Sequence, residues 1–187
     1  LHKETHSFPT RRSSDLATSR LREDARQIIH DAVGGTADHL VIFCGSGATA
    51  AVSKLIGILE LRLPDGLARR YRLLDQIPPA QRPVVFVGPY EHHSNELPWR
   101  ETIADVVVIG TDGHIDQAGL SAQLTRYAER PLRIGSFSAP SNVTGILSDA
   151  DAIAALLHAS GALSFWDHAA AGPYVPIRAG ESAPGAG

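Results

Sequence analysis

The sequence contains no methionine and only two lysines, Lys3 and Lys54, among its 187 residues. Because translation begins with methionine, we expect a processed, engineered or partial chain and not an intact translation product. The single cysteine, Cys44, excludes an internal disulfide framework and a multi-cysteine zinc site. These scarcities leave few thiols and amines that could serve as nucleophiles.

Long apolar runs and an excess of basic residues are also missing. No stretch reaches the ~18 consecutive apolar residues that predict a transmembrane helix, so we expect no membrane partner. The formal net charge of -3 argues against a dedicated nucleic-acid-binding protein, which would show a basic excess. The chain does have 43% apolar and 20% charged residues, a composition that supports a packed core.

The two ends of the chain differ in composition from the rest. Residues 1–16 lack helical or strand periodicity and resemble a translated sequencing adapter, so we set them aside as non-native. The alternative is a native disordered arm. Residues 178–187 are rich in glycine, alanine and proline, and we interpret them as a flexible tail or a second artefactual end. Residues 17–177 are predicted to hold the folded domain.

Apolar runs alternate with amphipathic stretches along this domain. The runs, which are typical of buried parallel strands, are 40–44, 83–89, 105–111, 131–137 and 162–166. The helical stretches are 20–33, 48–59, a short one near Ser94, 120–128 and 148–161. We expect Ser94 and Ser148 to cap the helices that they begin. This alternation predicts an α/β fold, a three-layer α/β/α sandwich with a mostly parallel sheet.

Polar and glycine residues gather where the predicted strands end. In open α/β sheets, ligands bind beyond the carboxyl ends of the strands. The segments at those ends are 45–49, 90–95, 136–142 and 167–168. They bring glycines, hydroxyls, two adjacent histidines, an asparagine and an aspartate to one edge of the sheet, which is therefore a candidate site.

The segment Gly45–Thr49, with the sequence GSGAT, stands between a predicted strand and a predicted helix. Small residues let the backbone wrap an anion, and the N–H groups of the following helix point at it, so a phosphate suits this place. The segment matches neither a Walker A loop nor G-x-G-x-x-G. A tight turn that needs glycine for packing remains an equal alternative.

His92, His93 and Asp167 are the other candidate site residues. One histidine of the pair can face the site and stack on a flat ligand, or the pair can be a surface or helix-capping feature. A metal site would need a third ligand such as Asp167 or His168, and no H-E-x-x-H spacing occurs, so none is predicted. Asp167 ends an apolar strand, where its charge needs a cationic ligand, an arginine or a capping role.

A phosphate cradle, a stacking imidazole and a partly buried carboxylate are together the anchors that pyridoxal 5'-phosphate (PLP) requires. The carboxylate keeps the pyridine nitrogen protonated, because an opposite charge raises the pKa of that nitrogen. The protonated ring then serves as an electron sink. We therefore predict PLP as the cofactor.

Three motifs, which occur in the family's order and spacing, carry a resemblance to a known family. They are YEHHSNELPWR (90–100), SFSAPSNVTGI (136–146) and ALSFWDHAAAGPYVPI (162–177). With them the chain resembles the class V aminotransferases of fold-type I PLP enzymes, which include cysteine desulfurases, over roughly residues 20–177. The resemblance implies that 17–177 is a partial PLP-binding large domain.

The resemblance also assigns roles to individual residues. It implies that the phosphate is held by Gly47, Ala48 and Thr49. It implies that His92, the expected catalytic residue, stacks on the ring and that Ala169 packs on the opposite ring face. Asn142 would lie near the cofactor oxygen and the substrate carboxylate, and Asp167 would pair with the pyridine nitrogen.

Three positions depart from the usual desulfurase pattern. Ala170 stands where a glutamine normally contacts the ring hydroxyl, Ala48 replaces a hydroxyl residue of the phosphate turn, and Trp166 replaces a small aliphatic residue. These departures indicate an outlying subfamily. Neither Lys54, which lies within a predicted helix, nor Lys3 matches the family's Schiff-base lysine, which follows the aspartate strand.

We therefore expect a partial large domain that is inactive by itself. The resemblance implies a parent enzyme that is homodimeric, cytoplasmic and active on a small amino-acid substrate, by transamination, desulfuration or β-elimination. The main alternative is a non-catalytic α/β domain that binds a phosphorylated ligand. A hydrolase that uses Ser46 or Ser136 with a histidine is disfavoured because no G-x-S-x-G motif is present.

Overall fold

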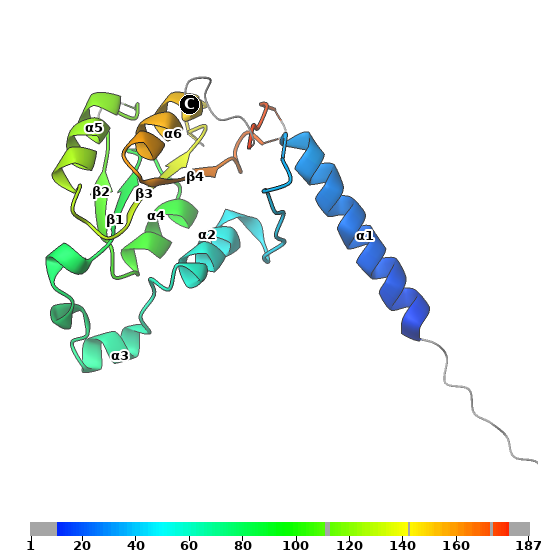
Figure 1. Ribbon diagram of the computed structural model, residues 1–187, viewed down its shortest axis with the longest axis horizontal. Helices are drawn as coiled ribbons and strands as arrows, with labels where there is room; N and C mark the ends of the chain where they lie inside the picture. The colour runs from blue at the N-terminus through cyan, green and yellow to red at the C-terminus, as the bar shows by residue number, and fades with distance from the viewer. Residues whose placement is uncertain (1–10, 111–112, 142, 173, 180–187) are drawn as a thin grey trace, which may run out of the picture. The chain divides into compact units, whose positions relative to one another are not determined.

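The computed structural model describes residues 11–110, 113–141, 143–172 and 174–179 (Figure 1). The chain forms two compact units. One contains the chain up to Phe43 together with the segment that begins at Pro176, and the other contains Cys44–Val175. No helix within the described ranges is long and apolar enough to cross a membrane.

The first unit is built on the helix α1, Arg11–Ala32. It begins nine residues before the predicted start, so residues 11–16 of the segment that we set aside are helical. No glycine or proline interrupts residues 11–33, and the helical hydrogen bonds can therefore continue through this polar stretch. The predicted glycine stop is confirmed, since Gly34 has a φ of 65° and the Gly35 N–H donates to the His30 carbonyl at 2.8 Å.

The predicted strand at 40–44 is wrong. This segment has no regular secondary structure, and Leu40 and Ile42 are 85% and 56% exposed. A strand exists only through pairing with a neighbour, and the described sheet has no strand that pairs with 40–44. Apolar, β-branched composition was therefore an insufficient signal here.

The second unit contains a four-stranded sheet with the order β2-β1-β3-β4, in which all pairs are parallel. The strands are β1 Val84–Val87, β2 Asp105–Val108, β3 Arg133–Ser138 and β4 Leu163–Asp167. They confirm the four later predicted strands. All four carboxyl ends lie at one edge of the sheet, which is the edge that the sequence marked as the candidate site.

Helices cover both faces of this sheet, as Figure 1 shows, so the predicted three-layer fold is confirmed. The helices of the second unit are α2 Gly47–Ile58, α3 Asp65–Arg70, α4 His93–Arg100, α5 Gln117–Arg126 and α6 Ala150–Ala159, with 3-10 turns at Leu74–Gln76 and Pro79–Gln81. Of these, α2 and α4 pack on one face of the sheet and α5 and α6 on the other. Both predicted caps are off by a residue or two. His92 caps α4 in place of Ser94, and Asp149 caps α6 in place of Ser148.

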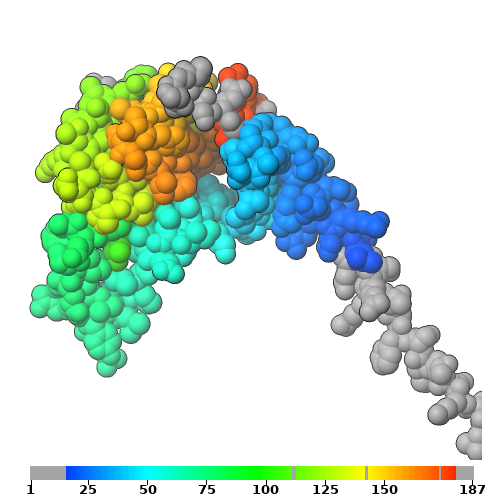
Figure 2. All heavy atoms as spheres, viewed as in Figure 1, coloured from blue at the N-terminus to red at the C-terminus, as the bar shows by residue number. Residues whose placement is uncertain are grey.

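The residues of β1 alternate between two cores. Val84 and Phe86 pack with α5 and α6, whereas Val85 and Val87 pack with α2 and α4. On β3, a Cβ at Gly135 would lie 2.5 Å from a methyl group of Leu157, so α6 approaches the strand backbone closely. In the space-filling view, α5 and α6 lie side by side (Figure 2).

Candidate functional site

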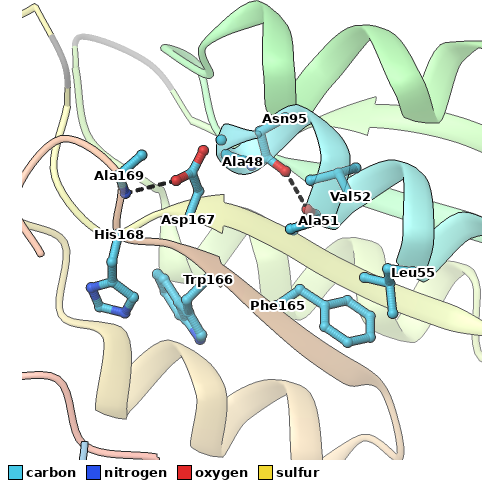
Figure 3. Close-up of a pocket in the computed structure, with 12 residues that line it drawn as sticks. Ala48, Ala51, Val52, Leu55, Asn95, Phe165, Trp166, Asp167, His168 and Ala169 are labelled. Atoms are coloured by element: carbon cyan, nitrogen blue, oxygen red, sulfur yellow. Dashed lines mark hydrogen bonds between the residues drawn. The ribbon is translucent and has the colours of Figure 1, made fainter. Parts of the chain in front are cut away.

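A cavity of about 430 Å³ opens at the carboxyl edge of the sheet (Figure 3). Its walls come from the turns of α2 between Gly47 and Leu55, from Asn95 of α4, from Ser136 of β3 and from the segment 165–169 at the end of β4. This volume lies within the range of small-molecule and cofactor sites. Elements that are far apart in the sequence thus meet at the predicted edge.

The N-terminus of α2 forms one wall of the cavity. Gly45 and Gly47 have φ angles of 71° and 64°, a conformation that favours glycine, so the turn requires both residues. Ser46 occupies the N-cap position but makes no side-chain hydrogen bond to the helix, which leaves the first N–H groups without a side-chain cap. Ala48 also lines the cavity, whereas Thr49 is exposed and is not part of the wall.

Asp167 brings a carboxylate to the same cavity. Its side chain points from the end of β4 toward the helix that carries Ala48 (Figure 3). One carboxylate oxygen accepts the Ala169 N–H at 2.8 Å, which fixes the loop after the strand. No lysine or arginine in the described part of the chain forms an ion pair with Asp167. The carboxylate is therefore available to a cationic ligand.

Asn95 is a site residue to which the sequence reasoning gave no role. It is only 2% exposed, it lines the cavity, and its side-chain oxygen accepts the Ser136 hydroxyl at 2.7 Å. Its Nδ2 donates to Glu91 at 2.7 Å. The spacing of Asn95 and Trp99, four residues apart on one helix, is the signal that both face the sheet.

Glu91 joins three elements at this edge. Its carboxylate accepts hydrogen bonds from the backbone N–H groups of Gly88 and Ser138, at 3.1 and 3.0 Å. It also accepts from the Ser138 hydroxyl at 2.6 Å and from the Asn95 side-chain amide. The ends of β1 and β3 and the start of α4 are therefore tied to one side chain. The sequence placed Glu91 on the edge but did not indicate these contacts.

His92 does not belong to the cavity wall. Its exposed ring caps α4, where Nδ1 accepts the Ser94 N–H at 3.2 Å, and it lies beside His93 with 5.7 Å between the ring centroids. These contacts match the capping alternative, and the stacking role stays a prediction. Asn142 lies outside the described residues. In the part of the chain that the structure describes, no three His, Cys, Asp or Glu side chains are grouped as a metal site.

Comparison with known families adds to this geometry. A family model described as Aminotransferase class-V matches residues 2–181. The chain belongs to the class V aminotransferase family. Its α/β fold is the fold expected of a member of this family.

Solved structures share the fold of this class V aminotransferase chain. The cysteine desulfurase CsdA from Escherichia coli is 16% identical with a TM-score of 0.57, over 88% of this chain and 38% of that one. The NifS-like protein from Rickettsia africae is 17% identical with a TM-score of 0.57, over 86% and 39%. The ureidoglycine-glyoxylate aminotransferase from Bacillus subtilis is 13% identical with a TM-score of 0.56, over 86% and 36%. The chain thus spans less than two fifths of the length of these structures.

His168 gives this class V aminotransferase chain a titratable group beside Asp167. The imidazole and Trp166 point away from Asp167 in Figure 3. Burial lowers the pKa of His168 from its ordinary value of 6.5, and the Asp167 carboxylate opposes this shift only in part. Its buried Nδ1 has no hydrogen-bond partner among the described residues, which is consistent with a neutral ring.

We expect the free energy of unfolding to fall as the pH is lowered below about 6.5. In that window the unfolded chain binds a proton at His168 more readily than the folded chain does, so acid favours unfolding, and the full contribution is present above it. Urea titrations between pH 7.5 and 5 measure the slope, and His168→Asn should make it shallower. An unchanged slope in this variant would show that His168 has no part in the pH dependence.

Proposed function

We propose that the cavity between α2, α4 and β4 binds PLP, and that the chain is the cofactor-binding part of an enzyme that acts on an amino acid. The observation that carries this proposal is Asp167. Its carboxylate has no basic partner in the described ranges and shares one cavity with the helix N-terminus at Gly47 and Ala48. An anionic phosphate and a cationic ring nitrogen are the ligand groups that these two features favour.

The residues that are present fit this cofactor. The first N–H groups of α2, at Gly47 and Ala48, would hold the phosphate, and Thr49 would extend this contact as the resemblance implies. Ala169 would pack on one face of the ring, and Asp167 would hold a proton on the pyridine nitrogen. When bound, the protonated ring withdraws electrons from the bonds of an attached amino acid.

Family membership supports the reaction class that we propose for the whole enzyme. Transamination, desulfuration and β-elimination all use this electron-withdrawing ring, and all three remain within the proposal. By the same resemblance, we propose that the whole enzyme is a cytoplasmic homodimer.

Lys54 is exposed on α2 and is not part of the cavity wall, so we assign it no role in cofactor capture.

A non-catalytic domain that binds a phosphorylated ligand is the second candidate function. The placement of Lys54 away from the cavity favours it, because no described lysine amine faces the site. Such a domain would recognise the phosphate at the α2 N-terminus and would gain little from Asp167. The two candidates therefore differ in how strongly the pyridine ring contributes to binding.

A titration of the 187-residue chain with PLP, followed by absorbance and tryptophan fluorescence, tests the proposed function. We expect PLP to bind at least about tenfold more tightly than pyridoxal or inorganic phosphate, because pyridoxal lacks the phosphate group and inorganic phosphate lacks the pyridine ring. Lys54→Ala is the control for covalent capture of the aldehyde and should leave the dissociation constant unchanged. PLP that binds no more tightly than phosphate would favour the second candidate.

A further inference from the structure

A directed series of hydrogen bonds runs from Trp99 to Glu91. The Trp99 indole N–H donates to the Ser136 hydroxyl at 2.9 Å, that hydroxyl donates to the Asn95 oxygen at 2.7 Å, and the Asn95 amide donates to Glu91 at 2.7 Å. An indole N–H can only donate and a carboxylate can only accept. The Glu91 end of the series therefore determines which way the Asn95 amide faces.

This orientation leaves one Asn95 N–H unused. The amide nitrogen carries two N–H groups, and only one of them has an acceptor, Glu91, among the described residues. Asn95 is 2% exposed and lines the cavity, so only water or a ligand within the cavity can reach the second N–H. A buried amide donor without a partner has a free-energy cost, which an acceptor on a bound ligand would remove.

We propose that the second N–H of Asn95 donates to an oxygen of the bound cofactor, and that Glu91 is the positioning residue that orients this amide. The inference rests on the proposed function, because it takes PLP as the ligand. It adds a ligand contact from α4 to the contacts from α2 and β4. Glu91 itself does not line this cavity, so it acts through Asn95.

Glu91 is suited to this role because all of its described partners are donors. Two of them, the N–H groups of Gly88 and Ser138, belong to the backbone and cannot be reversed. A Cβ at Gly88 would lie 2.6 Å from the Glu91 Oε1, so the carboxylate is packed closely against this loop. These contacts fix the position of the Glu91 carboxylate, which can therefore orient the Asn95 amide.

Glu91→Gln provides a test that preserves the shape of the side chain. The two backbone N–H groups keep the new amide oxygen at the Oε1 position, so the new NH₂ group faces Asn95 and the Ser138 hydroxyl. That hydroxyl can rotate to accept, but Asn95 must turn its amide over and place its oxygen toward residue 91. The N–H aimed at the ligand is then displaced, and we expect the PLP dissociation constant to rise about tenfold.

Glu96→Gln is the matched control, because Glu96 lies on α4, the helix that carries Asn95, and pairs with Arg100 outside this series. We expect it to leave the PLP dissociation constant within about twofold of the original value. If the original chain binds PLP and Glu91→Gln binds it equally well, the inference is overturned while the proposed function stands. If the original chain binds no PLP, the proposed function fails, and the inference that rests on it fails too.

NMR of the unsubstituted chain gives a second measurement that does not depend on how the variant folds. The two side-chain amide protons of Asn95 should differ in solvent exchange before PLP is added, because only one is bonded to Glu91. Addition of PLP should shift and protect the second proton. Equal exchange of both protons before PLP is added, or no change on saturation with PLP, would overturn the inference.

Discussion

Replacing Asp167 by asparagine is expected to weaken PLP binding about thirtyfold. A hydrogen bond between a carboxylate and a protonated ring nitrogen stabilises a complex by about 2 kcal/mol, which corresponds to this factor. The asparagine oxygen can still accept the Ala169 N–H, so the loop after β4 should keep its conformation. The loss should therefore appear in ligand affinity and not in folding.

Titration of both proteins with PLP, together with thermal unfolding of each, separates these effects. Asp149→Asn is the matched control, since Asp149 caps α6 through the Ala152 N–H and asparagine caps helices equally well. We expect this control to bind PLP as the unsubstituted chain does. An unchanged dissociation constant in Asp167→Asn would remove the observation on which the proposed function rests.

Trp99→Ala is expected to lower the free energy of unfolding by about 3–5 kcal/mol. The side chain is fully buried between α4 and the sheet, and its ring stacks on Phe165 with 6.5 Å between the centroids. Its removal leaves a cavity and also takes the indole donor away from Ser136. Urea unfolding measures the change, and the fluorescence of Trp166, the other tryptophan, reports it.

Two further variants place this effect on a scale. Trp99→Phe keeps an aromatic ring but loses the N–H and part of the bicyclic ring, so a smaller loss of about 1–2 kcal/mol is expected. Tyr174→Ala changes an aromatic residue that is 85% exposed and should stay within about 0.5 kcal/mol of the original stability. A loss below about 1 kcal/mol for Trp99→Ala would contradict the assignment of Trp99 to the core.

The parallel sheet was predictable because its strands are short apolar runs bounded by glycine, proline and polar residues. Val84–Val87 is buried on both faces, and such a run has few alternatives to a central strand. The segment 40–44 is similarly apolar and forms no strand, because pairing depends on a neighbour that composition does not specify. Helix starts were less predictable, since the N-cap positions of α4 and α6 are occupied by His92 and Asp149 and not by the nearby serines.

The candidate site was predictable where a residue directly follows a strand. Parallel strands bring their ends to one edge, so Gly47, Ala48, Asp167 and Ala169 were expected together and do line one cavity. The position of His92 could not be settled in this way, because either neighbouring histidine can face a site or cap a helix. That choice depends on the first turn of α4 and not on the spacing of residues.

The sequence by itself determined the fold class, the edge of the sheet that carries the candidate site and the residue types gathered there, because these follow from periodicity and from the geometry of parallel strands. Only the tertiary structure decided how side chains from different elements bond to one another. Glu91, Asn95 and Ser136 form a single hydrogen-bonded series because α4 packs on β3. The direction of that series depends on distances and donor positions that no spacing in the chain encodes.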